Sequence, residues 1–146
     1  VRLLSDGTAW RPLLHIEDMS KAFITCLNAT DSKVSGEIFN VGSNDDNCTV
    51  REIAEKVEQI VPNSKIEYSK NANKDSRSYR VNFDKITNQL NFKTDWNLDK
   101  GIRHIYEIMK ENNISEDDLN DKIFYRVKYL KYLLEQNKIN NNLEFQ

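Results

Sequence analysis

The residue near the start of the chain with the clearest chemistry is Arg11, which lies in the run Gly7–Met19. Pro12 follows it, and the residue before a proline is disfavoured in the helical region, so we expect extended backbone at Arg11. A guanidinium held in this way suits two-pronged binding of a phosphate or a carboxylate. The alternative is a surface ion pair with Glu17 or Asp18, whose negative charges also suit the first turn of the helix that follows.

A second group of charged residues lies within the segment 69–84. In this segment Asp75 is a candidate acceptor for the hydroxyls of a ribose, and Arg77 and Arg80 are candidates for binding phosphate. The alternative is a solvated loop whose ions pair with one another, and composition alone favours that alternative.

Hydrophobic periodicity places these residues between several short elements. The pattern predicts a helix at about 17–29 and a strand over 37–42. Thr49 and Glu52 form a capping box, which predicts a helix that begins there and is stopped by Pro62. The other expected elements are strands at 1–4 and 65–68, an extended segment at 79–83, and helices that begin near Asp84, Asn97, Ser115 and Asp121.

The composition is ordinary for a globular domain, with 30% charged residues, 38% hydrophobic residues and a net charge of -2. We expect one domain over residues 1–136 and an asparagine-rich tail at 137–146 that frays.

Without a basic stripe or an apolar run of about 20 residues, we expect no nucleic-acid partner and no membrane partner. Cys26 and Cys48 lack metal-type spacing and form no disulfide scaffold, so the expected compartment is the reducing cytoplasm. Because the chain begins with Val1 in a strand-like run, we expect it to be cut from a longer protein.

Four segments in order resemble the NAD-dependent epimerase/dehydratase family, the extended short-chain dehydrogenase/reductases that act on nucleotide sugars. The segments are residues 7–19, with G-x-x-x-R-P-x-x-H-x-x-D; residues 36–54, with N-x-G and then T-x-x-E-I-A; residues 75–86; and residues 90–102, with L-x-F and then L-x-x-G-I. Each motif is weak alone, but their order and spacing over residues 1 to about 110 are specific for the family. They are not specific for one substrate.

The resemblance implies an α/β fold, of which this chain is the helix-rich, substrate-binding C-terminal part without the N-terminal Rossmann domain. It implies that Arg11 contacts the nucleotide diphosphate, that Asp75 holds the nucleotide ribose and that Arg77 makes a second phosphate contact. It also implies NAD as cofactor of the full-length enzyme, and as partners a nucleotide sugar, the missing Rossmann half and, as a further option, a second copy in a homodimer. The family often has an arginine shortly before the acidic residue, where this chain has Ala72. Asn91 replaces a frequent glycine, and asparagine can also adopt the left-handed conformation.

The chain lacks the pattern that the family uses for its cofactor. Its glycines are Gly7, Gly36, Gly42 and Gly101. They form no glycine-rich turn between a strand and a helix, which the pyrophosphate of NAD requires. Tyr106 and Lys110 have the spacing of the family's catalytic pair but follow the substrate-binding motifs, so we interpret Tyr106 as a packing residue. We therefore expect no catalytic or cofactor-binding residue here and no activity from this chain alone.

The remaining residues receive structural interpretations. We expect His15 to be packed or hydrogen-bonded and His104 to lie on an exposed helix face, because no third ligand joins them at metal spacing. Without its other half, the chain should expose an apolar face and self-associate. The open alternatives to the enzyme fragment are a non-catalytic module that binds nucleotide sugars and a helical interaction module.

Overall fold

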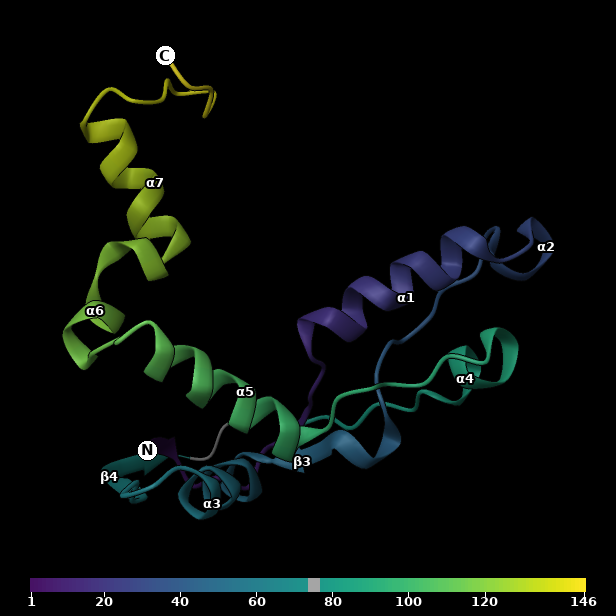
Figure 1. Cartoon of the computed structure of the whole chain (residues 1–146), viewed down its shortest axis with the longest axis horizontal. Coiled ribbons are helices and arrows are strands. Elements are labelled where there is room, and N and C mark those ends of the chain that lie inside the picture. The colour runs from purple at the N-terminus through teal and green to yellow at the C-terminus, as the bar shows by residue number, and fades with distance from the viewer. Residues whose placement is uncertain (74–76) are drawn as a thin grey trace. The chain divides into compact units, whose positions relative to one another are not determined.

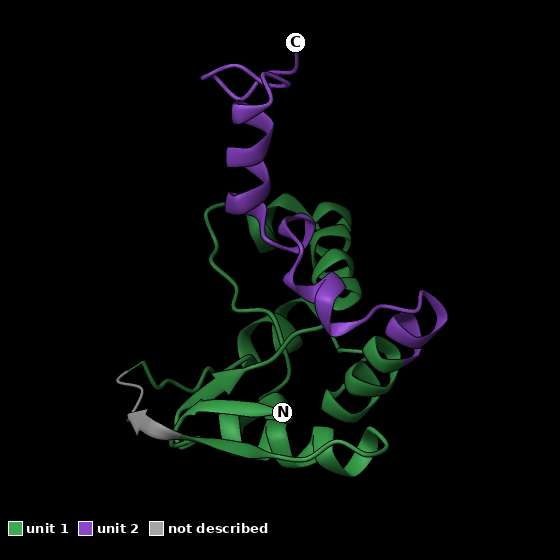
Figure 2. Ribbon diagram, turned by 90° about the vertical axis from the view of Figure 1, so that its left-hand side faces the viewer, with its two compact units in different colours: residues 1–106 green, residues 107–146 purple. Residues whose placement is uncertain are grey.

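The computed structural model describes residues 1–73 and 77–146, and it describes side chains outside 70–76. The chain divides into two compact units, Val1–Tyr106 and Glu107–Gln146 (Figure 2). The boundary between them lies within the domain that the sequence predicts over residues 1–136. The α/β class predicted from the sequence is confirmed, with helices predominating over short strands.

Unit 1 carries two small sheets among the residues described. Strand β1 (Arg2–Ser5) pairs in parallel with β4 (Glu67–Asn73), and β2 (Trp10–Pro12) pairs antiparallel with β3 (Asn47–Thr49). The paired residues are Arg2 with Glu67, Leu3 with Tyr68, Ser5 with Asn73, Trp10 with Thr49, Arg11 with Cys48, and Pro12 with Asn47. The extended backbone predicted at Arg11 is therefore confirmed.

Helix α1 (Ile16–Asn28) has one buried face and one exposed apolar face. On the buried face, Ala22 packs with Ile86 and Phe92 in a hydrophobic core. Ile86 belongs to α4 (Asp84–Leu90), which lies beside α1 in Figure 1. The exposed apolar side chains are Ile16, Met19, Phe23, Ile24 and Leu27. Most of the large apolar side chains of this helix are thus exposed.

The strand predicted over residues 37–42 is wrong. The segment keeps the alternation of a strand, because Phe39 and Val41 pack against the core while Ile38 is 83% exposed. A strand also requires a hydrogen-bonded neighbour, and no described strand lies beside this segment. Gly42 closes the segment against Phe83, whose ring lies 2.7 Å from the position that a Cβ would take, so a larger residue there would require this buried ring to move.

Helix α3 (Val50–Ile60) begins and ends as the sequence predicts. The Thr49 N–H donates to Glu52 Oε2 at 2.6 Å, and the Glu52 N–H donates to Thr49 Oγ1 at 3.2 Å. Asn97 precedes helix α5 (Leu98–Glu111) as predicted, and its Oδ1 accepts from the Lys100 N–H at 3.0 Å. The other helices with residues in unit 1 are α2 (Asp31–Val34), the 3-10 turn η1 (Asn44–Asp46) and α5 (Leu98–Glu111), whose last residues belong to unit 2.

Unit 2 continues with α6 (Glu116–Asn120), the 3-10 turn η2 (Lys122–Phe124) and α7 (Arg126–Glu135). Ser115 and Asp118 form a second capping box, at the point where the sequence predicts a helix to begin. After α7, Ile139 is buried and forms a single bridge with Phe145. The structure thus records a folded-back tail over 137–146, and its fraying stays a prediction about motion.

Candidate functional site

Arg11 lies in the middle of β2, and its side chain reaches the segment that carries Arg77. Its Nη1 donates to the carbonyl oxygen of Trp10 at 2.7 Å and to the carbonyl oxygen of Arg77. The guanidinium carbon lies 5.8 Å from the centre of the Tyr79 ring. Two carbonyls on one nitrogen and an aromatic ring hold the guanidinium in a defined orientation, which favours two-pronged binding of an anion.

The segment 77–83 runs alongside β2 and β3 although it is no strand. The Tyr79 N–H donates to the Trp10 carbonyl at 3.4 Å. The side chain of Asn47 takes the place of a neighbouring strand, because its amide nitrogen donates to the Val81 carbonyl and its oxygen accepts the Val81 N–H, both at 2.9 Å. The structure assigns no strand over 79–83, and Phe83, with ψ of 9°, is not extended; the side-chain amide of Asn47 satisfies the backbone of Val81.

Aromatic side chains and arginines lie together where β2 runs beside the segment 77–83. The Arg80 guanidinium carbon lies 4.4 Å from the centre of the Trp10 ring, within the range of a cation–π contact. Arg77, Tyr79 and Arg80 are exposed, and Tyr79 has 55% of its surface accessible. We call the surface formed by Trp10, Arg11, Arg77, Tyr79 and Arg80 the arginine surface.

The structure brings together two of the three predicted substrate-binding residues, since Arg11 contacts the backbone of Arg77. Asp75 lies outside the described residues. The sequence identified the arginines but missed Trp10 and Tyr79, although the spacing Arg77-x-Tyr79 places both side chains on one side of an extended segment.

A half-buried aromatic cluster is formed by three side chains, His15, Trp96 and His104. The His15 ring stacks on Trp96 with centroids 3.9 Å apart and an angle of 12° between the planes. His15 Nδ1 accepts the Glu17 N–H at 3.2 Å, so a neutral His15 carries its proton on Nε2 and donates it to His104 Nδ1, 3.2 Å away. The structural interpretation of His15 is confirmed. The exposed position predicted for His104 is wrong, because α5 turns that residue toward His15.

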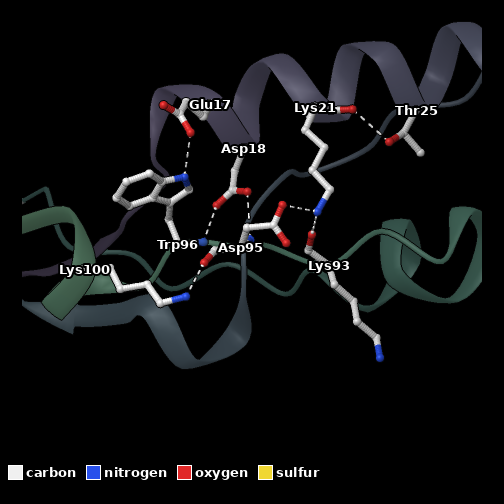
Figure 3. A network of polar contacts seen from close by, with 8 residues as sticks. All are labelled: Glu17, Asp18, Lys21, Thr25, Lys93, Asp95, Trp96 and Lys100. Atoms are coloured by element: carbon white, nitrogen blue, oxygen red, sulfur yellow. Dashed lines mark hydrogen bonds and ion pairs between the residues drawn. The ribbon is translucent and has the colours of Figure 1, made fainter. Parts of the chain in front are cut away.

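Asp18 is the buried centre of a polar network that ties α1 to the segment before α5 (Figure 3). Its two carboxylate oxygens accept the backbone N–H groups of Asp95 at 2.9 Å and Trp96 at 3.1 Å. Around it, Glu17 Oε2 accepts the indole N–H of Trp96 at 3.0 Å, and Lys21 pairs with Asp95 at 2.6 Å. Asp18 is 1% exposed and its oxygens accept two backbone N–H groups, so it is not the surface partner of Arg11 that the sequence allowed beside Glu17. This network ties α1 to the segment that carries Asp95 and Trp96.

A cavity of about 310 Å³ lies between the run Leu13–His15, α3 and α5. Its walls are mainly apolar, with Asp46 as one of the few acidic groups that line it. Burial raises the pKa of Asp46, partly offset by the Leu98 N–H, which donates to Asp46 Oδ1 at 3.2 Å. Arg11 does not line this cavity, which is therefore distinct from the arginine surface.

The described residues contain no group of three or more His, Cys, Asp or Glu side chains placed to hold a metal ion. Within the same residues, none of the helices combines the length and the apolar character needed to cross a bilayer.

Part of the chain matches the model of a known protein family. Residues 1–42 match the model of the family described as "NAD dependent epimerase/dehydratase family". The matched residues include Arg11, the buried Asp18 and the segment that ends at Gly42. This match and the fold support the resemblance seen in the sequence.

Several solved structures share this fold, and the descriptions of the first two reported below name NAD. They include dTDP-glucose 4,6-dehydratase from Bacillus anthracis str. Ames in complex with NAD, which is 24% identical with a TM-score of 0.63 over 76% of this chain and 34% of the other. UDP-glucuronic acid 4-epimerase from Bacillus cereus, in complex with UDP-glucuronic acid and NAD, is 20% identical with a TM-score of 0.63 over 76% and 35%. L-threonine dehydrogenase from Clostridium difficile is 18% identical with a TM-score of 0.65 over 79% and 37%.

These likenesses show a shared fold, and the chain spans little more than a third of the length of each of these structures. Since the third is a threonine dehydrogenase, the fold by itself selects no substrate. The glycines of this chain also do not fit a pyrophosphate site. Gly7 faces Arg51, Gly42 faces Phe83, and no two of the four glycines lie in one turn.

Proposed function

We propose that this chain is the substrate-binding part of an NAD-dependent nucleotide-sugar epimerase or dehydratase. In this proposal Arg11 and Arg77 grip the diphosphate of the nucleotide, and Asp75 holds the ribose. The observation that carries the proposal is the hydrogen bond from the Arg11 guanidinium to the backbone carbonyl of Arg77. These two residues are 66 positions apart in the sequence. The family match over residues 1–42 and the nucleotide-sugar enzymes among the structures of the same fold support it.

The arginine surface has the chemistry that a nucleoside diphosphate requires. Arg11 is a planar donor fixed on extended backbone, and Arg77 and Arg80 add exposed positive charge from one neighbouring segment. The rings of Trp10 and Tyr79 offer flat apolar faces within reach of the same cations. Binding at this surface would position the sugar for chemistry carried out by residues that this chain does not contain.

We propose that the remainder of such an enzyme, including its NAD-binding Rossmann half, covers the exposed apolar face of α1. Phe23 is 67% exposed, Leu27 is 83% exposed, and Ile38 of the unpaired extended segment is 83% exposed. A segment with strand alternation and no paired strand among the described residues is suited to joining the edge of a sheet. NAD supplies hydride transfer when it is bound to the full enzyme, and the residues of this chain hold the nucleotide sugar.

The test is calorimetric titration of the chain with UDP-, dTDP-, GDP- and CDP-sugars. We expect saturable binding of one nucleotide class, and we expect Arg11→Ala to weaken it at least about tenfold, because a charged hydrogen bond contributes about 1.5–3 kcal/mol. Arg11→Lys keeps the charge but loses the planar fork, so its affinity should be intermediate. We also expect no binding of NAD by this chain alone.

Arg103→Ala is the matched control, since Arg103 is an exposed arginine on α5 and is not part of the arginine surface. Its affinity for the nucleotide sugar should equal that of the wild type. If no nucleotide binds, or if Arg11→Ala binds as tightly as the control, the proposed diphosphate site does not exist. Circular dichroism of each variant separates loss of the site from loss of the fold.

A further inference from the structure

The apolar cavity between the run Leu13–His15, α3 and α5 has no part in the proposed function. Its volume of about 310 Å³ lies at the lower end of the range of small-molecule pockets, which is about 300–1,000 Å³. All of the residues that line it belong to unit 1. Because protein interiors are close-packed, an apolar space of this size is more typical of a binding site than of a core.

Gly101 leaves room for a ligand on the side of α5. Leu98, Ile102 and Ile105 also line the cavity, and their spacing places them on the same face of the helix as Gly101. A Cβ at Gly101 would have no heavy atom within 4 Å, apart from its chain neighbours and the backbone of its own helix. Because a glycine inside a helix is destabilising relative to alanine, the helix itself does not explain this residue. The room that Gly101 leaves in the cavity does.

The charged side chains that line the cavity are carboxylates. In this described part of the chain, the lining includes Asp18 and Asp46 but no lysine or arginine. Each oxygen of Asp18 already has a partner, because they accept the N–H groups of Asp95 and Trp96. Asp46 is 9% exposed; the Leu98 N–H donates to its Oδ1, and no described residue donates to its Oδ2. One oxygen of a buried carboxylate is thus available to a ligand in the cavity.

A cation is the ligand group that this carboxylate favours. Burial raises the pKa of Asp46, the Leu98 N–H partly offsets this effect, and the neighbouring charges of Asp45 and Asp18 raise the pKa further. An ionised Asp46 is therefore costly without an opposite charge beside it, and a hydrogen-bonded cation removes that cost. The indole of Trp96 lines the same cavity, and tryptophan is the best aromatic partner of a cation.

We propose that this cavity binds a small primary amine with an apolar or aromatic body, whose ammonium group donates to Asp46 Oδ2. The body of the ligand occupies the space beside Gly101 and contacts the apolar side chains of α3 and α5. Asp46 and Asp18 would repel an anion, and a purely apolar ligand would leave Oδ2 without a donor. This site goes beyond the proposed function, because the arginine surface suits anions and this cavity suits cations.

The test is titration of the full chain with three probes of similar shape, followed by proton–nitrogen correlation spectra. The probes are phenethylammonium, the neutral phenethyl alcohol and the anion hydrocinnamate. We expect the ammonium to bind with a Kd of about 1 mM or tighter, the alcohol to bind at least about tenfold more weakly, and the anion not to bind. The ammonium should shift the backbone signals of Leu98 and Gly101 and the indole signal of Trp96, since these groups line the cavity.

Two variants test the contacts one at a time. Asp46→Asn keeps an acceptor for the Leu98 N–H but loses the charge, so it should bind the ammonium at least about tenfold more weakly and the alcohol as the wild type does. Gly101→Leu should fill the cavity from α5 and abolish binding of both probes, while leucine favours the helix. Asp45→Asn is the matched control, because Asp45 is an exposed carboxylate that does not line the cavity. Its affinity should stay within about twofold of the wild type.

The proposal is overturned if the ammonium causes no saturable shifts up to about 10 mM, or if it binds no more tightly than the alcohol. It is equally overturned if the shifts lie outside the cavity, if Asp46→Asn binds the ammonium like the control, or if a folded Gly101→Leu still binds it. Circular dichroism checks each fold, and Asp46→Asn decides the outcome if Gly101→Leu does not fold. Both variants should bind nucleotide sugars like the wild type, so failure of this proposal and failure of the proposed function are distinguishable.

Discussion

Replacing Asp18 by Asn distinguishes two physical roles for the same carboxylate. The sequence assigned to it a favourable interaction with the dipole of α1, which contributes about 0.3–1 kcal/mol at a surface. The structure gives it two hydrogen bonds, from the backbone N–H groups of Asp95 and Trp96, at a position that is 1% exposed. These roles predict different losses of stability.

The magnitude follows from the number of acceptors. Asn retains one carbonyl oxygen, so it can accept from only one of the two N–H groups, and its own NH₂ then points at the other. An unsatisfied donor in such a place costs about 1–3 kcal/mol, and the remaining bond also loses its charge. We therefore expect Asp18→Asn to lower the free energy of unfolding by about 2–4 kcal/mol, a large part of the total stability of a domain.

The assay is urea denaturation followed by tryptophan fluorescence, because Trp96 lies within the network. Glu17→Gln is the matched control. It removes the neighbouring charge from the same helix turn but keeps an oxygen for the indole N–H of Trp96. We expect it to cost no more than about 1 kcal/mol. If Asp18→Asn costs no more than Glu17→Gln, then the two backbone hydrogen bonds do not stabilise the fold and the argument from the network fails.

Four further predictions concern local features of unit 1. Thr49→Ala should cost about 1 kcal/mol in unfolding free energy, measured by urea titration, because it removes the cap of α3. Hydrogen bonds from Thr49 lower the pKa of Glu52, so the stability from Glu52 is present at neutral pH and lost as the pH falls through that lowered pKa; a Glu52→Gln variant that differs equally from wild type at about pH 7 and about pH 3 would contradict this. Burial raises the pKa of Asp46, so its stabilisation is full below the ordinary aspartate pKa and is lost as the pH rises through the raised value; Asp46→Asn, which keeps an acceptor for Leu98, should melt above the wild type near neutral pH but not at about pH 3. Asn91, with φ of 53°, should tolerate Gly but lose about 1 kcal/mol on change to Ala, as calorimetric melting would show.

The candidate site was predicted in part because its cations carry a local signal. Arg11 is marked by the proline that follows it, and Arg77 and Arg80 stand in a charged run that the sequence separates from the helices. Their proximity depends on the Asn47 side chain, which binds the backbone of Val81 and has no pattern that reveals its partner. The role of each arginine toward a ligand stays a prediction.

The sequence by itself determined the features whose causes lie within one or two helical turns. The capping boxes at Thr49 and Ser115, the stop at Pro62 and the extended backbone before Pro12 each need only neighbouring residues. Such interactions form at the same spacing whatever the rest of the chain does.

The tertiary structure alone decided the features that need a distant partner. Residues 37–42 have the alternation of a strand but lack a neighbour, so the pattern did not become a strand. His104 is half-buried because the rings of His15 and Trp96 lie against it. Asp18 is buried because the backbone N–H groups of Asp95 and Trp96 donate to its oxygens. Burial and hydrogen-bond satisfaction are properties of the surroundings in space, and a residue type with its sequence neighbours does not specify them.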